Sequence, residues 1–145
     1  LVAQCDLAVA ADTAQFATSG VKYGIFCNTP GVALARNLSR KHALEMLLTG
    51  EPIDAADALA RGLVNRVVEA DALDRTIDEI ARSIIEKSPA VVAAGKRTFY
   101  EQLDAPLAAA YDVASQAMVR GMRTGDAAEG IDAFAEKRKP VWKSD

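Results

Sequence analysis

The sequence changes its pattern once, at about residue 68, and this change limits the folds that the chain can adopt. Before it, short runs rich in β-branched and aromatic residues alternate with helical patterns; the runs are residues 7–10, 15–17 and 64–68. Such alternation is typical of a layered α/β fold. From Asp71 onward only helical patterns appear. We therefore expect an α/β region followed by a helical region.

Proline and glycine mark the expected helices of the second region. Asp71 is placed to cap a helix that Pro89 ends, and Pro89 then lies in the first turn of the next helix. Pro106 begins a third helix, and Gly125 separates it from a fourth over residues 126–138. The spacing predicts four consecutive helices with short connections.

The first region contains three helical stretches between its strand-like runs, over residues 30–38, 41–48 and 55–61. The third has Asp54 at its N-cap position and Gly62 just after its end. Gly20, Gly24 and Gly31 lie between the run at Phe16 and the first of these helices. Loops between a sheet and a helix commonly bind ligands, although these glycines match no nucleotide-binding fingerprint.

The composition excludes several classes of protein. Nine Gly, five Pro and two Cys among 145 residues argue against collagen-like, disordered and disulfide-stapled chains, and no apolar run has the length of a membrane span. A net charge of −3 argues against nucleic acid as a partner. Alanine contributes 29 residues, so side chains are small and helix formers are abundant. We expect a soluble domain with no nucleic-acid or membrane partner.

The N-terminus and the cysteines bear on processing and compartment. The chain begins at Leu1 without an initiator Met, a basic segment or a cleavage site, so we expect a fragment without a signal or transit peptide. Cys5 and Cys27 are expected to be free thiols of a reducing compartment. The expected location is cytoplasmic, with the mitochondrial matrix as the alternative.

Few side chains in the first region could perform acid–base or metal chemistry. Residues 13–44 contain no Asp or Glu, so this segment offers no carboxylate. His42 is the only histidine and lies in an expected helix beside Arg40 and Lys41, which indicates a solvent-facing position. One His and two distant Cys have no metal-ligand spacing, so no metal site is expected.

The C-terminus concentrates positive charge beside aromatic residues. Lys137, Arg138, Lys139 and Lys143 lie close in sequence to Phe134 and Trp142. These cations could hold a phosphorylated ligand, with an aromatic ring as a stacking face. They could equally be a solvated helix end that complements the helix dipole.

Six strings of the sequence resemble the crotonase, or enoyl-CoA hydratase/isomerase, superfamily. They are residues 5–10, the pair Gln15-Phe16, the loop to Gly24, and residues 43–50, 55–68 and 129–140. Together they extend over essentially the whole chain. The loop of residues 26–36 and the ending of residues 137–142 are similar to one branch of that superfamily.

The resemblance implies a fold and an assembly. Its members build a spiral core from repeated ββα turns and add a helical C-terminal region that supports trimers or hexamers. Residues 1–68 would be the C-terminal part of the spiral core, and residues 69–145 the helical assembly region. A homotrimer or hexamer is therefore expected.

The resemblance also implies a chemistry on acyl-CoA substrates, as in fatty acid metabolism. Members stabilise the thioester enolate with two backbone N–H groups and commonly add water to an enoyl double bond with two glutamates. The implied activity is that of an enoyl-CoA hydratase/isomerase, a lyase or isomerase that needs no cofactor besides the coenzyme A of its substrate.

The implied residues carry over only in part. The oxyanion hole and the first glutamate fall upstream of Leu1, and Gly20 stands where the second glutamate belongs, so no catalytic residue is assigned. Expected substrate-binding residues are Phe16, Thr18, Gly20, Tyr23 and Cys27, and expected CoA-binding residues are Phe134 and Lys137. The alternatives are a non-catalytic acyl-CoA-binding or regulatory homologue, and an assembly subunit.

Overall fold

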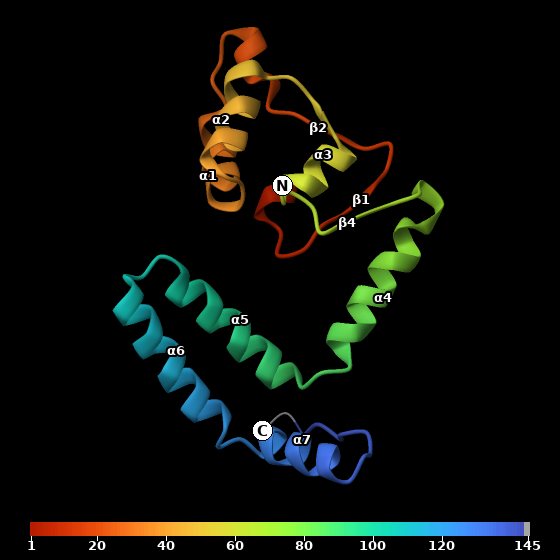
Figure 1. Cartoon of the computed structure of the whole chain (residues 1–145), viewed down its shortest axis with the longest axis vertical. Coiled ribbons are helices and arrows are strands. Elements are labelled where there is room, and N and C mark those ends of the chain that lie inside the picture. Colours follow the sequence, from red (N-terminus) through yellow and green to blue (C-terminus); the bar gives the residue numbers. More distant parts are fainter. Residues whose placement is uncertain (144–145) are drawn as a thin grey trace. The chain divides into compact units, whose positions relative to one another are not determined.

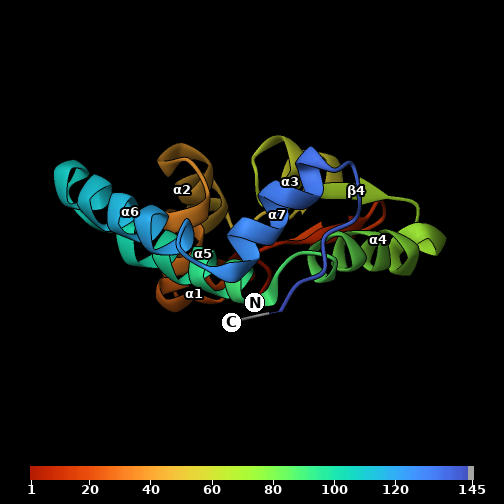
Figure 2. The ribbon, with the colours of Figure 1, turned by 90° about the horizontal axis from the view of Figure 1, so that it is seen from below.

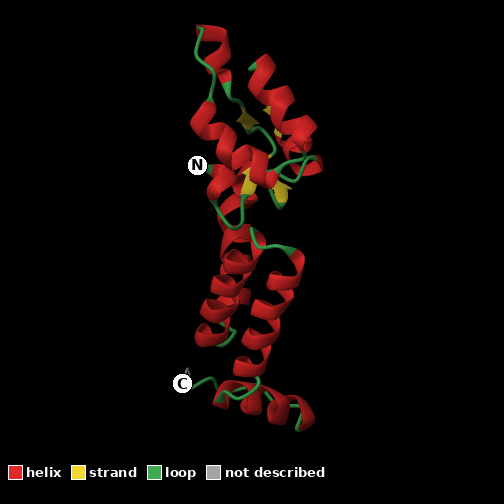
Figure 3. Cartoon of the chain, turned by 90° about the vertical axis from the view of Figure 1, so that its left-hand side faces the viewer, coloured by secondary structure: helices red, strands yellow, loops and turns green. Residues whose placement is uncertain are grey.

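The computed structural model describes residues 1–143, which fall into two compact units. The first is Leu1–Glu79 and the second begins at Ile80, within helix α4 (Leu73–Ile85) (Figure 1). The last strand ends at Val68, where the sequence pattern changes, and only helices follow it in the described chain (Figure 3). The predicted domains, residues 1–68 and 69–145, stay a prediction.

The first unit mixes short strands with helices. Its strands are β1 (Val9–Ala11), β2 (Gln15–Phe16), β3 (Ile53–Asp54) and β4 (Arg66–Val68). Its α-helices are α1 (Asn28–Asn37), α2 (Arg40–Thr49) and α3 (Ala55–Ala60), and its 3₁₀ helices are η1 (Val2–Gln4), η2 (Ser19–Tyr23) and η3 (Ala70–Ala72).

The strands form two small sheets. β1 and β4 pair in parallel, with Ala10 opposite Val67, and β2 pairs antiparallel with β3, with Phe16 opposite Ile53. Asn65 extends the first pairing, because its side-chain oxygen accepts the backbone N–H of Ala8 at 2.8 Å and its own backbone N–H donates to the Ala8 carbonyl at 2.8 Å. Three of the four strands overlap the predicted runs; β3 was not predicted.

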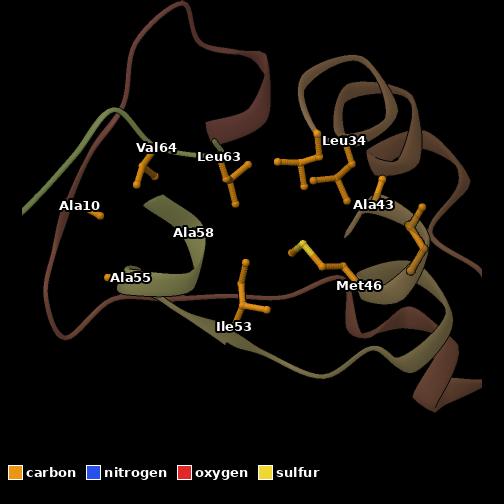
Figure 4. Packing of buried hydrophobic residues seen from close by; sticks show 11 residues of the cluster. Ala10, Leu34, Ala43, Met46, Ile53, Ala55, Ala58, Leu63 and Val64 are labelled. Carbon is orange, nitrogen blue, oxygen red and sulfur yellow. The ribbon is translucent and has the colours of Figure 1, made fainter. Parts of the chain in front are cut away.

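The apolar core of the first unit is built from small and medium side chains. Figure 4 shows Met46, Ile53 and Leu63 pointing toward one another. Ala55 and Ala58 of α3 are 0% exposed, so this short helix approaches the strands closely. Alanine permits that approach because it has no side chain beyond Cβ. The core lies between α1, α2, α3 and the two sheets.

The helix ends of the first unit follow the predicted signals. The carboxylate of Asp54 accepts the backbone N–H of Asp57 at 2.8 Å, which confirms Asp54 as the N-cap of α3. Gly62 has φ +82° after α3, as predicted. The prediction that Asp71 caps α4 was wrong in detail, because Asp71 lies inside η3, a 3₁₀ turn that leads directly into α4.

The regular secondary structure of the second unit is entirely helical within the described residues. α5 (Pro89–Leu103) and α6 (Leu107–Gly121) lie side by side as a hairpin, and α7 (Gly125–Ala135) follows (Figure 2). Ser88 and Thr124 cap α5 and α7 with their side-chain oxygens. Within residues 1–143, no helix combines the length and apolar character that crossing a bilayer requires.

Candidate functional site

A cavity of about 500 Å³ lies in the first unit, between β2, η2, the start of α1 and the middle of α2. Four of the five predicted substrate-binding residues line it: Phe16, Thr18, Gly20 and Cys27. The fifth, Tyr23, does not line it and is 78% exposed. The structure therefore brings four of these residues together and leaves Tyr23 apart, while their role in binding stays a prediction.

Thr18 anchors one wall of this cavity. Its side chain is buried, and its hydroxyl donates to the carbonyl oxygen of Met46 at 2.9 Å. The bond joins the start of η2 to the middle of α2, far away in the sequence. Thr18 thus holds the loop in place, since a buried hydroxyl is costly unless it is hydrogen-bonded.

Gly20 occupies a position with no room for a side chain. A Cβ there would lie 2.5 Å from the carbonyl oxygen of Ile25 and 2.6 Å from the Sγ of Cys27. The loop closes on itself at this point, because the Ile25 N–H donates to the Gly20 carbonyl at 3.0 Å. A glutamate at position 20 would therefore require the backbone at Ile25 to move.

The lining of the cavity has little acid–base capacity. Its described residues include no Asp, Glu or His, and Cys27 is its one side chain with an ionisable group. His42 is half-buried in α2 and does not line it. No cluster of His, Cys, Asp and Glu suited to a metal ion occurs within residues 1–143. Besides its shape and backbone groups, this cavity offers the polar side chains of Gln15, Thr18 and Ser19.

The two predicted CoA-binding residues lie at the end of α7, in the second unit. Phe134 is 87% exposed, and Lys137, also exposed, donates its backbone N–H to the Phe134 carbonyl at 3.3 Å. Lys137 has φ +55°, and it is the single non-glycine residue with positive φ in the described chain. The two side chains thus belong to one tight turn.

An ion-pair network follows this turn. The guanidinium of Arg138 bonds both carboxylate oxygens of Glu129, at 2.5 and 3.0 Å, and its Nε donates to Glu136 at 2.5 Å. These hydrogen bonds raise the pKa of Arg138. The bonds from Arg138 and from the backbone N–H of Val141 lower the pKa of Glu129 from 4.5 to about 2.

The segment of residues 139–143, here called the strap, is tied back onto the helices. Its backbone N–H groups at Val141 and Lys143 donate to Glu129 and Asp126 of α7, at 2.7 and 2.8 Å. The indole N–H of Trp142 donates to the Glu86 carbonyl at 2.8 Å. Figure 1 shows the chain after α7 turning back along that helix.

A buried polar pair completes these ties. Asp126 is 2% exposed, and it accepts the hydroxyl of Ser88 at 2.5 Å. Sequence reasoning missed Asp126 and Glu129 as structural acceptors. The available signal was their spacing of three residues on one helix, which places both carboxylates on the same face.

The chain matches the family model described as enoyl-CoA hydratase/isomerase over residues 1–145. Enoyl-CoA hydratase domain-containing protein 3, mitochondrial, of Rattus norvegicus is 54% identical over 142 residues, which are 98% of this chain and 47% of that protein. The chain spans about half the length of the curated relatives it matches.

Two solved structures give the same likeness. A Mycobacterium smegmatis enoyl-CoA hydratase has a TM-score of 0.95 at 51% identity, over 97% of this chain and 55% of that one. The human enoyl-CoA hydratase domain-containing protein 3 has a TM-score of 0.94 at 55% identity, over 97% and 56%. These matches confirm the resemblance predicted from the six strings, the expected fold class, and the branch indicated by residues 26–36 and 137–142.

Proposed function

The chain belongs to the enoyl-CoA hydratase/isomerase family, and from this premise we propose that it binds acyl-CoA and acts as an enoyl-CoA hydratase or isomerase. The observation that carries the proposal is the cavity of the first unit, which gathers Phe16, Thr18, Gly20 and Cys27 of the predicted substrate-binding set. The acyl thioester occupies this cavity, with no cofactor besides the coenzyme A of the substrate.

The chemistry of the proposal rests on charge stabilisation. Removing a proton beside a thioester, or adding water to its conjugated double bond, places negative charge on the thioester oxygen, and two fixed N–H groups stabilise it. We assign those groups to positions upstream of Leu1, as the family resemblance implies. Isomerisation needs one general base where hydration commonly uses two carboxylates, and Gly20 cannot supply one. Isomerisation is therefore the less demanding reaction for this cavity.

A second candidate is a non-catalytic acyl-CoA-binding or regulatory homologue. The observation in its favour is the filled space beside Gly20, where the Ile25 carbonyl and the Cys27 thiol exclude a carboxylate side chain. The cavity remains open for a ligand in this alternative. The two candidates differ in turnover, not in binding.

The nucleotide end of CoA is proposed to lie against the turn that carries Phe134 and Lys137. The exposed ring of Phe134 offers a stacking face, and Lys137 a cation for a phosphate. Arg138 is excluded from this role, because Glu129 and Glu136 already bind its guanidinium.

We also propose that the helical region serves assembly, as a homotrimer or hexamer. Large apolar side chains remain exposed on its helices, among them Phe99, Leu107, Tyr111 and Met118. The mitochondrial names of the curated relatives favour the mitochondrial matrix over the cytoplasm as the location.

The test uses the full-length protein with crotonoyl-CoA, followed by the loss of the conjugated enoyl absorbance, and calorimetry with a non-reactive acyl-CoA. Turnover supports the hydratase, and binding without turnover supports the second candidate. An isomerase is tested in parallel with a 3-enoyl-CoA, whose conversion raises that absorbance. If the protein neither binds the acyl-CoA nor turns over the substrates, both candidates are overturned and the assembly role is the one left.

A further inference from the structure

The turn that carries Lys137 has an unusual backbone. A lysine at φ +55° has a steric cost that glycine does not have, so the surrounding structure must hold it there. Helices often end with such a left-handed residue, but it is usually glycine. Lysine is therefore an unusual residue at this position.

Two bonds hold the turn from its own backbone. The N–H of Lys137 donates to the Phe134 carbonyl at 3.3 Å, and the N–H of Arg138 donates to the Ala133 carbonyl at 3.0 Å. These bonds satisfy carbonyls at the end of α7. They define the turn but leave the chain beyond Arg138 free to depart in other directions.

Glu129 fixes that departure. Its carboxylate binds the guanidinium of Arg138 with both oxygens and also accepts the backbone N–H of Val141 at 2.7 Å. The Glu129 side chain of α7 therefore holds two points of the chain after Lys137. These are Arg138, which follows it directly, and Val141 of the strap. A bidentate pair of this kind adds geometric specificity as well as energy.

The ion-pair network also divides the C-terminal cations into paired and unpaired ones. Arg138 has its charge balanced by Glu129 and Glu136. Lys137 and Lys139, by contrast, have no ion-pair partner within the described residues. The ammonium groups of the lysines are the ones open to an anion.

We propose that Glu129 is a positioning residue for the anion site: by binding Arg138 and Val141 it holds Lys137 in its left-handed conformation and leaves the Lys137 ammonium to meet the phosphates of CoA. This inference rests on the proposed function, since it takes the CoA nucleotide as the anion. Glu129 does not touch the ligand.

The test measures the affinity for CoA by calorimetry in the full-length protein and in Glu129→Gln. Removing a negative charge near a phosphate site would by itself tighten binding. The positioning role predicts the opposite, a weakening of about two- to fivefold, because the turn no longer holds Lys137. Asp132→Asn, the same charge change at an exposed position of α7, is the matched control and is expected not to weaken binding.

A double mutant separates positioning from general loss of structure. Lys137→Ala is expected to weaken CoA binding by roughly three- to tenfold. Glu129→Gln added to Lys137→Ala should cause no further loss, because its effect passes through Lys137. Further weakening in that background would show a merely structural role and overturn the inference.

The remaining outcomes distinguish the inference from the function beneath it. If Lys137→Ala weakens binding but Glu129→Gln does not, the CoA site stands and the positioning role fails. If Lys137→Ala binds CoA as the unmodified protein does, the proposed CoA site itself fails. Arg138→Lys keeps the charge and loses the bidentate fork, so it repeats the test should Glu129→Gln not fold.

Discussion

The interactions that stabilise the first unit internally differ from those inside the second unit. In the first, eleven apolar side chains from Ala10 to Val64 form one buried cluster. In the second, Ala133 is the one buried apolar residue of the described part, and the other two buried residues are Ser88 and Asp126, which bind each other. Apolar burial stabilises the first unit, and hydrogen bonds and ion pairs organise the second.

This difference separates stability from geometry. Apolar contacts are non-directional, and a buried side chain contributes about 1.5–3 kcal/mol. A hydrogen bond contributes only about 0.5–1.5 kcal/mol net, but it fixes two atoms relative to each other. The second unit thus gains precise positions for Phe134 and Lys137 with little stability of its own, while the exposed apolar faces of α5 and α6 remain available for burial.

The largest effect is expected for the core of the first unit. Met46→Ala removes a side chain that is 2% exposed and should lower the free energy of unfolding by about 2–5 kcal/mol. Met118→Ala in α6, where the side chain is 68% exposed in the single chain, should change the free energy of unfolding of the monomer by less than about 0.5 kcal/mol. Urea denaturation of the monomer, followed by circular dichroism, measures both variants. Equal losses in the monomer would break the contrast, whereas a loss for Met118→Ala that appears only in the assembled protein would agree with the proposed assembly.

The next effect concerns two glycines, one in each unit. Gly20→Ala forces Cβ against the Ile25 carbonyl and the Cys27 thiol and should cost about 1–3 kcal/mol. Gly95→Ala, in the interior of α5 with nothing within 4 Å of the new Cβ, should instead stabilise by about 0.5–1 kcal/mol. The melting temperatures of both variants test these opposite expectations. A stabilised Gly20→Ala would contradict the close packing of Gly20 against Ile25 and Cys27.

A smaller effect is expected for the polar pair of the second unit. Ser88→Ala removes the cap of α5 and one hydrogen bond of the buried Asp126 carboxylate, and should cost about 1–2 kcal/mol. Ser39→Ala removes the cap of α2 at an exposed position and should cost about 0.5–1 kcal/mol. Hydrogen exchange at the Val91 amide reports the local change. Equal costs for both serines would show that the buried bond to Asp126 contributes nothing.

The smallest effect is a dependence on pH. The pKa of Glu129 is about 2 in the folded chain and 4.5 ordinarily, so its contribution to stability is fully present above about pH 5. That contribution should decline as the pH falls from 4.5 toward 2. The measurement is the difference in urea midpoint between the unmodified protein and Glu129→Gln as a function of pH. A difference that stays constant down to pH 2 would contradict the ion-paired carboxylate.

Local signals in the sequence were sufficient for most of the fold. Proline and glycine positions gave the four final helices to within a few residues, and Asp54 and Gly62 bounded α3, because capping depends on neighbours in sequence. β3 could not be found this way. It has two residues, Ile53 and Asp54, and exists because Phe16 and Gln15 pair with it across a long stretch of chain.

The sequence predicted candidate residues for the site but not their contacts. The loop resemblance gathered Phe16, Thr18, Gly20, Tyr23 and Cys27, of which all but Tyr23 line one cavity, and their role in binding stays a prediction. No sequence pattern indicated that the Thr18 hydroxyl binds Met46, or that Cys27 fills the space beside Gly20. These facts depend on how the loop packs on α2 and on itself, and packing of this kind is not encoded by neighbours.

The lack of room for a side chain at Gly20 also limits which substitutions this position can accept during evolution. Any single replacement there costs stability before it can offer a new chemical group, because Cβ itself meets the Ile25 carbonyl. A carboxylate can enter the position only together with a rebuilt segment of residues 21–27. Across the family, the residue at this position and the path of the following loop should therefore change together, as one inherited unit.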